Sequence, residues 1–113
     1  MPPLVLICVD YASPLINIFH RRRRYGISIL RQDQKDICNR FAQRTQDRFD
    51  GVPWLKGETG VPLIPGALAH FECEIRQMVP AGDHEVLIGE VVAAGSHEGS
   101  PLVFFERSYP RLE

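Results

Sequence analysis

The segment AGDHEVLIGEVV, residues 81–92, places a histidine where a turn becomes a strand. Gly82 and Asp83 belong to the turn and would fix the direction of His84, which begins a segment that is apolar on both alternating faces. An imidazole has an unperturbed pKa of about 6.5, so a ring held there can donate or accept a hydrogen bond near neutral pH. The simpler interpretation is a turn residue that tolerates a ring. Spacing alone favours that interpretation, because a single histidine is weak evidence for a site.

Four consecutive arginines follow His20 in the segment HRRRRY, residues 20–25. Arginine matches the geometry of a phosphate group with a planar fork of donors. The run also falls where a short helix is expected to end, and the helix dipole stabilises cations there. We favour a solvated helix end from which one arginine could reach an anionic ligand. No aromatic residues are interleaved with the arginines, so a nucleic-acid surface is not predicted.

The segment VDYASP, residues 9–14, joins an apolar strand to a helix. Backbone N–H groups and the Ser13 hydroxyl at such a junction can bind an anion. Helix capping, with Ser13 at the N-cap and Pro14 at the first helical position, explains the same residues equally well. The chain has neither the glycine motif of a Rossmann site nor that of a P-loop. It also lacks G-x-S-x-G and H-E-x-x-H.

The carboxylates do not form a recognisable catalytic or metal-binding pattern. Glu72 and Glu74 could be mistaken for a glycosidase pair, but His70 and Arg76 beside them predict a charge-balanced exposed face. Asp10 and the other aspartates are scattered without ligand spacing, and no C-x-x-C pair is present. We therefore predict no metal site.

The composition is that of one globular domain spanning residues 1–113. Hydrophobic residues make up 44% of the chain and charged residues 24%, and the net charge of −1 favours neither nucleic acid nor an anionic membrane. No apolar run approaches the roughly 18 residues that cross a membrane. Cys8, Cys38 and Cys73 occupy apolar positions and are interpreted as buried reduced thiols, which predicts a cytoplasmic protein.

Hydrophobic periodicity predicts a mainly β domain with two short helices. The first strand is apolar throughout, which predicts burial on both faces. In the strand over residues 68–79, alternation assigns Val79 to the same face as Phe71, Cys73 and Ile75. Residues 44–66 lack periodicity and are expected to form a long loop, which is usually functional or a lid at such a length. The expected strands span residues 3–9, 25–30, 68–79, 84–92 and 101–106, and the expected helices follow Pro14 and span residues 32–43, the second capped by Asp33.

Short turns between mostly antiparallel strands indicate a small barrel or sandwich. The strand over residues 84–92 is apolar on both faces, so one face would fill a barrel interior. The other face would need cover, for instance from a second subunit.

Several motifs follow one another in order through nearly all of the chain: PPLVLICVDYAS, YGISIL, QDQKDICNRFAQRTQDRFDGVPW, GVPLIPGALAHFECEI, GDHEVLIGEV and PLVFFERSYPRL. The most specific combination is G-D-H-x-x-x-x-G-E-V with an R-F-x-G-V-x-W loop before it and a P-L-x-F-F strand after it. This series of motifs resembles the flavin reductase family, the small NAD(P)H:flavin oxidoreductase components of two-component flavin-dependent monooxygenases.

This resemblance implies a split β-barrel of the FMN-binding, Greek-key type that binds FMN or FAD and works as a homodimer. It implies hydride transfer from NAD(P)H to the flavin, with reduced flavin then leaving to serve a separate monooxygenase. The flavin carries the chemistry in such enzymes, and the protein supplies orientation and electrostatics. A non-catalytic flavin-binding or dimerisation module of the same fold is the alternative. A pyridoxamine-phosphate-oxidase-like function lacks support, because its phosphate-binding residues are not found.

The resemblance also implies roles for individual residues. His84 is expected to lie near the flavin and nicotinamide as the catalytic residue. The family often has Asn at the position of Ser28, and the shorter side chain of Ser28 reaches less far. The expected cofactor-binding residues are Val9, Asp10, Ala12, Ser13, Ser28, Gly82, Asp83, Tyr109 and Arg111.

The family normally begins with further strands that precede the block PPLVLICV. They include a Thr/Ser-rich segment that holds the isoalloxazine and the phosphate. Because this sequence starts inside that block, the resemblance implies a barrel that is incomplete at its N-terminus.

Overall fold

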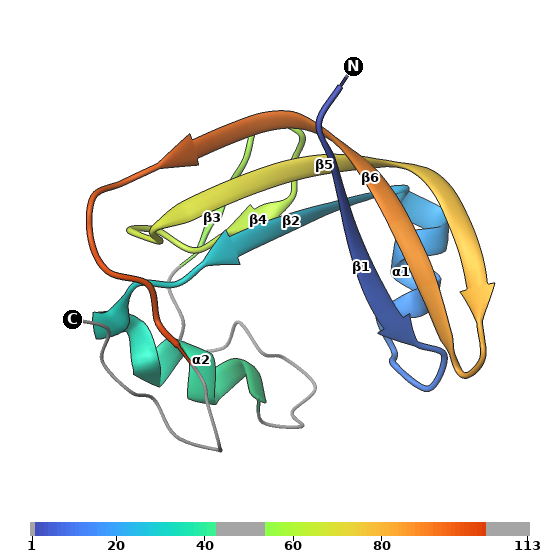
Figure 1. Cartoon of the computed structure of the whole chain (residues 1–113), viewed down its shortest axis with the longest axis horizontal. Coiled ribbons are helices and arrows are strands. Elements are labelled where there is room, and N and C mark those ends of the chain that lie inside the picture. Colours follow the sequence, from blue (N-terminus) through green and yellow to red (C-terminus); the bar gives the residue numbers. More distant parts are fainter. Residues whose placement is uncertain (1, 43–53, 104–113) are drawn as a thin grey trace.

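The computed structural model of the chain describes residues 2–42 and 54–103, and these form a curled antiparallel sheet with short helices and a small hairpin (Figure 1). None of the helices in these two ranges is long and apolar enough to span a membrane. The elements are β1 (Leu4–Asp10), α1 (Ile16–Arg22), β2 (Arg24–Ile29), the 3-10 helix η1 (Gln32–Gln34), α2 (Lys35–Ala42), β3 (Leu55–Lys56), β4 (Pro62–Leu63), β5 (Ala69–Ala81) and β6 (His84–Ser96).

The main sheet has the strand order β1-β6-β5-β2, and every neighbouring pair is antiparallel. The long β5–β6 hairpin forms its centre, with β1 on one side and β2 on the other (Figure 1). Leu4 pairs with Glu90 and Asp10 pairs with His84, so β1 covers only the first half of β6. Its last residue therefore lies beside the turn that joins β5 to β6.

Two irregularities in the β5–β6 pairing change which side chains face the core. Arg76 and Val92 have no partner residue, because the register shifts at each of them. A bulge moves the following residues of its strand to the opposite face. Met78 consequently packs against the core cluster, whereas Val79 is exposed. The prediction that Val79 shares a face with Ile75 is therefore wrong.

The core lies on the face of the sheet that carries Tyr25, Cys73, Ile75 and Leu87, all of which are buried. The Tyr25 hydroxyl donates a 2.6 Å hydrogen bond to the carbonyl of Val5 across the sheet. Burial and the neighbouring Cys73 thiol raise the pKa of Tyr25 to about 12, so the phenol remains a donor at physiological pH.

Helix α1 covers part of this core face. Phe19 packs edge-on against Tyr25, with ring centroids 6.2 Å apart, and Ile16 is buried. The helix begins at Ile16 with Leu15 at the N-cap position, rather than at Ser13 and Pro14 as expected. The Ser13 hydroxyl instead accepts a hydrogen bond from the Leu15 N–H within the preceding turn.

The opposite face of the sheet is called the outer face here. Over β2 it is covered by the β3–β4 hairpin, which lies inside the segment that we expected to be a loop. A Cβ atom on Gly26 would lie 2.9 Å from the Val61 side chain, so the hairpin needs a glycine beneath it. Glu72 is buried there and accepts hydrogen bonds of 2.8 Å from both the N–H and the hydroxyl of Thr59. The expectation that Glu72 belongs to an exposed charged face is therefore wrong.

The remaining outer face is uncovered in the part of the chain that the structure describes. Residues of β1 alternate between exposed and half-buried, so the prediction that this strand is buried on both faces is wrong. Cys73 is buried and Cys38 is half-buried, but burial was predicted incorrectly for Cys8, which is exposed on this face. The uncovered apolar side chains, which we call the outer patch, are Leu4, Leu6, Cys8, Val79, Val86 and Ile88.

Two further local expectations differ from the structure. The expected helix cap, Asp33, is not the N-cap residue. Arg31 occupies the N-cap position of η1, and its N–H donates a hydrogen bond to the Gln34 side chain. Asp33 forms an ion pair with the Arg31 guanidinium. Pro101 forms an isolated bridge with Arg31 rather than starting an observed strand, and residues 104–106 of that expected strand lie outside the described residues.

Leu87→Ala tests this account of the core. Leu87 is fully buried in β6, so truncation leaves a cavity and should lower the free energy of unfolding by about 2–5 kcal/mol. Leu55→Ala is the matched control, because the Leu55 side chain is 45% exposed, and its cost should stay below about 1 kcal/mol. Urea denaturation followed by circular dichroism measures both. Equal losses for the two variants would contradict the assignment of the core.

Candidate functional site

The β1–β6 register brings polar side chains from two distant segments to one end of the outer face. Asp10, the last residue of β1, pairs directly with His84, the first residue of β6. Asp83 precedes His84 in the turn, and its carboxylate lies 2.8 Å from the His84 Nδ1 atom. Possible ligand atoms of Asp10, Asp83 and His84 all lie within 4.8 Å of one another. We call these three residues the His84 cluster.

The two carboxylates favour a protonated imidazole. The hydrogen bond that the His84 ring donates to the Asp83 carboxylate is the largest cause that raises the pKa of His84, and the charges of Asp83 and Asp10 act in the same direction. The same hydrogen bond lowers the pKa of Asp83. Because Nδ1 is held by Asp83, the ring has a fixed orientation, and Nε2 has no hydrogen-bond partner within the described ranges. The cluster can therefore present one N–H donor to a ligand.

The turn after β1 is held by its own hydrogen bonds and by the β5–β6 turn. The Ala12 N–H donates to Asp10 Oδ1 at 2.8 Å, and the Ser13 N–H donates to the Asp10 carbonyl at 2.9 Å. The Tyr11 N–H donates to the Asp83 carbonyl at 3.0 Å. Gly82 permits the tight β5–β6 turn with a φ of 61°. The structure thus brings Asp10, Ala12 and Ser13 close to the turn that carries His84.

Not all of the expected site residues lie here. Val9 packs its side chain against the core. Ser28 pairs with His70 near the other end of β5, and its hydroxyl accepts a hydrogen bond from the Ile64 N–H. The structure therefore does not bring Ser28 to His84 within one chain. Tyr109 and Arg111, and most of the R-F-x-G-V-x-W loop, lie outside the described residues.

A second polar cluster, which the sequence analysis missed, lies on the core face beside His84. Glu85 is buried, and its carboxylate contacts His20 Nε2 from α1 and accepts a 3.5 Å hydrogen bond from the Tyr11 hydroxyl. Burial, followed by the charge of Glu85, raises the pKa of Tyr11. The sequence gives one signal for this cluster: alternation along the strand assigns Glu85, an ionisable residue, to the core face. These contacts fasten the β1–α1 segment to the strand that begins with His84.

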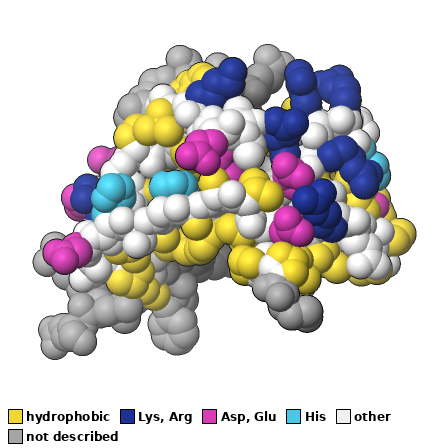
Figure 2. Space-filling view, turned by 90° about the horizontal axis from the view of Figure 1, so that it is seen from above, with side chains coloured by type: hydrophobic (Ala, Val, Ile, Leu, Met, Phe, Trp, Pro, Cys, Tyr) yellow, Lys and Arg dark blue, Asp and Glu magenta, His cyan; other side chains and the backbone are white. Residues whose placement is uncertain are grey.

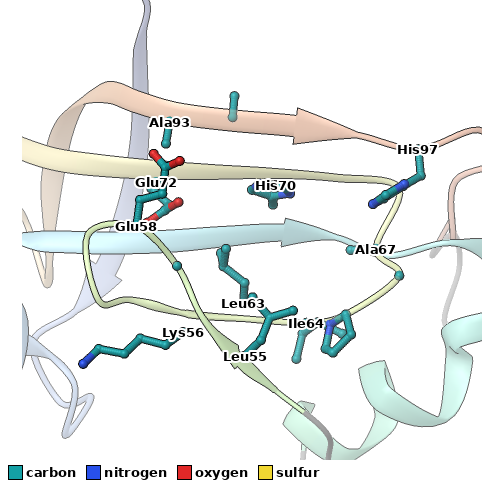
Figure 3. A pocket seen from close by; sticks show the side chains of 14 residues that line it. Leu55, Lys56, Glu58, Leu63, Ile64, Ala67, His70, Glu72, Ala93 and His97 are labelled. Atoms are coloured by element: carbon teal, nitrogen blue, oxygen red, sulfur yellow. The ribbon is translucent and has the colours of Figure 1, made fainter.

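A pocket of about 400 Å³ opens on the outer face at the opposite end of the sheet. The β3–β4 hairpin forms one wall, and β5 and the end of β6 form the other (Figure 3). His70, His97, Glu58 and Glu72 supply its polar groups, although the Glu72 carboxylate is already occupied by Thr59. The neighbouring Leu63 and Ile64 are apolar. This pocket is therefore separate from the His84 cluster.

Comparison with known proteins assigns the chain to a family. Residues 1–113 match the model of the flavin reductase like domain. The chain belongs to this family. The resemblance noted in the sequence is thereby confirmed.

Relatives of this chain share about a third of its residues. It is 37% identical over 114 residues to "Flavin reductase (NADH)" of Kitasatospora aureofaciens, covering 97% of this chain and 60% of that protein. It is 33% identical over 113 residues to "Flavin-dependent monooxygenase, reductase subunit HsaB" of Rhodococcus jostii, covering 99% of this chain and 58% of that protein. The chain thus spans about three fifths of the length of these relatives.

Solved structures confirm the fold. The NADH:FAD oxidoreductase SgcE6 of Streptomyces globisporus superimposes with a TM-score of 0.93 at 34% identity, covering 99% of this chain and 70% of that one. A second structure of SgcE6, in complex with NAD and FAD fragments, gives a TM-score of 0.92 at 35% identity, with 99% and 69% coverage. The predicted mainly β, split-barrel class is therefore correct for this chain.

Asp83→Asn tests the electrostatics of the His84 cluster. The carboxylate stabilises the imidazolium, so its removal should lower the pKa of His84 and move the loss of the proton to lower pH. An NMR titration that follows the His84 ring protons measures this shift. Asp33→Asn, in the exposed residue of η1, is the control and should leave the titration unchanged. An unaltered midpoint in Asp83→Asn would show that Asp83 does not govern the charge of the ring.

Proposed function

We propose that this chain is a flavin reductase that transfers a hydride from NAD(P)H to FMN or FAD, with His84 as its catalytic residue. The observation that carries the proposal is the His84 cluster in a chain of this family. An oriented imidazole, with Nδ1 held by Asp83 at 2.8 Å and no hydrogen-bond partner for Nε2 among the described residues, suits a ligand carbonyl or an anionic ring. A binding site for an uncharged apolar ligand would not need two carboxylates to keep the ring protonated.

The residues around the cluster have chemistry that fits the two nucleotides. When bound, a flavin accepts the hydride and a reduced nicotinamide donates it. His84 Nε2–H would hydrogen-bond to the nicotinamide carboxamide or balance the charge of reduced flavin. Asp83 and Asp10 favour the protonated form of that ring, since both raise its pKa. The contacts of Tyr11 and His20 with Glu85 hold the segment carrying Asp10, Ala12 and Ser13 in place beside it.

Reduced flavin would then leave the chain and serve a separate flavin-dependent monooxygenase. The relative HsaB, whose name describes a reductase subunit of such a monooxygenase, supports this part of the proposal. NADH is named for the relative from Kitasatospora aureofaciens, and SgcE6 is an NADH:FAD oxidoreductase.

The outer patch supports a homodimer. Leu4 and Leu6 are 59% and 61% exposed, and they are contiguous with Cys8 and Val86 across the β1–β6 pairing. Exposed apolar surface of this kind usually marks an interaction site. The His84 cluster lies at the end of the same face, so a second copy seated on the patch would also shield the cluster from water.

The alternative is a non-catalytic flavin-binding or dimerisation module of the same fold. One observation favours it: the outer patch is uncovered within the described residues, as a surface for association would be. Oxidation of NADH or NADPH with added FMN or FAD separates the two functions. Flavin binding without nucleotide oxidation would support the module.

His84→Ala should reduce kcat/KM for NADH oxidation by roughly 10- to 100-fold, which is the effect of losing one charge-assisted hydrogen bond. The loss of NADH absorbance with saturating FMN measures it. His97→Ala is the matched control, because His97 is an exposed histidine just beyond the opposite end of β6. Unchanged rates in His84→Ala would remove this residue from the mechanism.

Leu6→Glu should convert a dimer of this chain into a monomer, because it places a charge in the middle of the outer patch. Sedimentation velocity at several protein concentrations measures the oligomeric state. Ile29→Glu is the control, since Ile29 is 41% exposed but lies on β2, away from the patch. A dimer that survives Leu6→Glu would exclude this face as the interface.

A further inference from the structure

Glu85 places a negative charge at a core position of β6. Figure 2 shows Asp and Glu side chains on one surface of the molecule, several of them beside Lys or Arg. Glu85 is instead only 5% exposed, and Glu72 is the one other buried carboxylate among the described residues. Alternation assigns Glu85 to the same face as Leu87, which is fully buried. An apolar residue at this position would avoid the cost of burying a charge, so stability alone does not explain the glutamate.

The two partners that the described residues supply to Glu85 both belong to the segment that follows β1. The Glu85 Oε1 atom contacts Nε2 of His20, and Oε2 accepts a 3.5 Å hydrogen bond from the Tyr11 hydroxyl. Tyr11 precedes helix α1, whereas His20 lies in the last turn of that helix. One carboxylate therefore attaches both ends of this segment to the start of β6.

The same segment is bonded to the turn that carries Asp83. The Tyr11 N–H donates to the Asp83 carbonyl at 3.0 Å. Tyr11 is therefore attached to Glu85 through its side chain and to the β5–β6 turn through its backbone. The Asp83 carboxylate in turn lies 2.8 Å from His84 Nδ1. A continuous series of contacts thus leads from Glu85 to the His84 ring, although adjacent side chains of a strand point to opposite faces.

Asp10, the second carboxylate beside the imidazole, is also fixed by this segment. The Ala12 N–H donates to Asp10 Oδ1 at 2.8 Å, and Asp10 pairs with His84 across the two strands. The pKa of His84 is raised by its hydrogen bond to Asp83 and by the charges of Asp83 and Asp10. The charge of Glu85 is not among these causes. We therefore expect Glu85 to act on the ring through position rather than through its own charge.

We propose that Glu85 is a positioning residue for His84. Its contacts with His20 and Tyr11 hold the β1–α1 turn against the β5–β6 turn, so that both aspartates stay beside the imidazole. The proposal rests on the proposed function and deepens it, because an oriented ring is what His84 would contribute to ligand binding. A buried, hydrogen-bonded carboxylate suits this role, since packing restricts its side chain to one orientation.

Glu85→Ala and Glu85→Gln separate position from charge. The alanine variant loses both contacts, whereas glutamine keeps the length of the side chain and an oxygen that accepts hydrogen bonds. In Glu85→Ala, the titration midpoint of the His84 ring protons, followed by NMR, should fall part of the way to its value in Asp83→Asn. In Glu85→Gln, the midpoint should remain that of the unmodified chain.

Amide hydrogen exchange measures the position of the segment directly. The Tyr11 N–H is bonded to the Asp83 carbonyl, so its exchange should accelerate about tenfold in Glu85→Ala and stay unchanged in Glu85→Gln. The Gly57 N–H, which donates to the Val61 carbonyl at 2.8 Å in the β3–β4 hairpin, is the internal control. Neither measurement needs turnover. If the chain oxidises neither NADH nor NADPH, the proposed function fails, and both measurements still test the positioning role.

Glu72→Ala is the matched control, because Glu72 is also a buried carboxylate but is held by Thr59 on the opposite face. It should lower the midpoint of urea unfolding, as Glu85→Ala does, and leave the His84 titration unchanged. Equal shifts of the His84 midpoint in Glu72→Ala and Glu85→Ala would indicate general loosening and overturn the proposal. Equal shifts in Glu85→Ala and Glu85→Gln would assign the effect to charge and overturn it as well. No shift in Glu85→Ala would refute it directly.

Tyr11→Phe keeps the proposal testable if Glu85→Ala does not fold. It removes one hydroxyl from a side chain that is 42% exposed, so the fold should persist. The His84 midpoint should move in the direction expected for Glu85→Ala, by a smaller amount, because the contact between Glu85 and His20 remains. An unchanged midpoint in Tyr11→Phe would break the series of contacts on which the positioning role depends.

Discussion

The antiparallel register between β1 and β6 is the constraint on which the candidate site depends. It sets Asp10 opposite His84 and, through the same alternation, sends Val5, Ile7 and Val9 to the core face. Because side chains alternate along a strand, a slip of one residue would bury Leu4 and Leu6 and remove Asp10 from the imidazole. The Tyr25 hydroxyl, which donates to the Val5 carbonyl at 2.6 Å, opposes such a slip from the core side. Core packing and the charge of His84 are therefore fixed by one pairing.

Two buried carboxylates attach α1 and the β3–β4 hairpin to the main sheet. Burying a charge is costly unless it is paired and hydrogen-bonded. Glu85 meets this requirement with His20 and Tyr11, and Glu72 meets it with Thr59. In the first case the contact attaches α1 and the β1–α1 turn to the core face. In the second it attaches the loop of the β3–β4 hairpin to the outer face. Backbone N–H donors and hydrogen bonding from Thr59 hold the pKa of Glu72 below its usual value despite its burial.

The sequence predicted the elements of the sheet better than the faces that its residues occupy. The four strands of the main sheet and both helices were found within a few residues, because apolar periodicity and the turn residues mark them locally, whereas the β3–β4 hairpin was missed. The position of Val79 was missed because an unpaired Arg76 shifts the register, and a bulge leaves no local signal in alternation. Glu72 was missed because its partner Thr59 lies on a hairpin inside an aperiodic segment. His84 and Asp83 were recognised from the G-D-H block, whereas the approach of Asp10 required a register between strands 74 residues apart. The expected proximity of Ser28 to this site is not found within one chain.

One face of the sheet carries the hydrophobic core, and the other carries the residues of the proposed chemistry. Helix α1 covers part of the core face, where Phe19 packs against Tyr25, so the buried apolar side chains there are removed from water by the chain itself. The outer face carries the His84 cluster at one end and the pocket beside β3–β4 at the other, with the outer patch between β1, β5 and β6. An exposed imidazole beside two carboxylates is screened by water, and its hydrogen bonds to a ligand strengthen when that water is excluded. Covering the outer patch would therefore do more than bury Leu4 and Leu6, since it would also lower the dielectric constant around His84. In this arrangement, association and site chemistry are coupled through one surface.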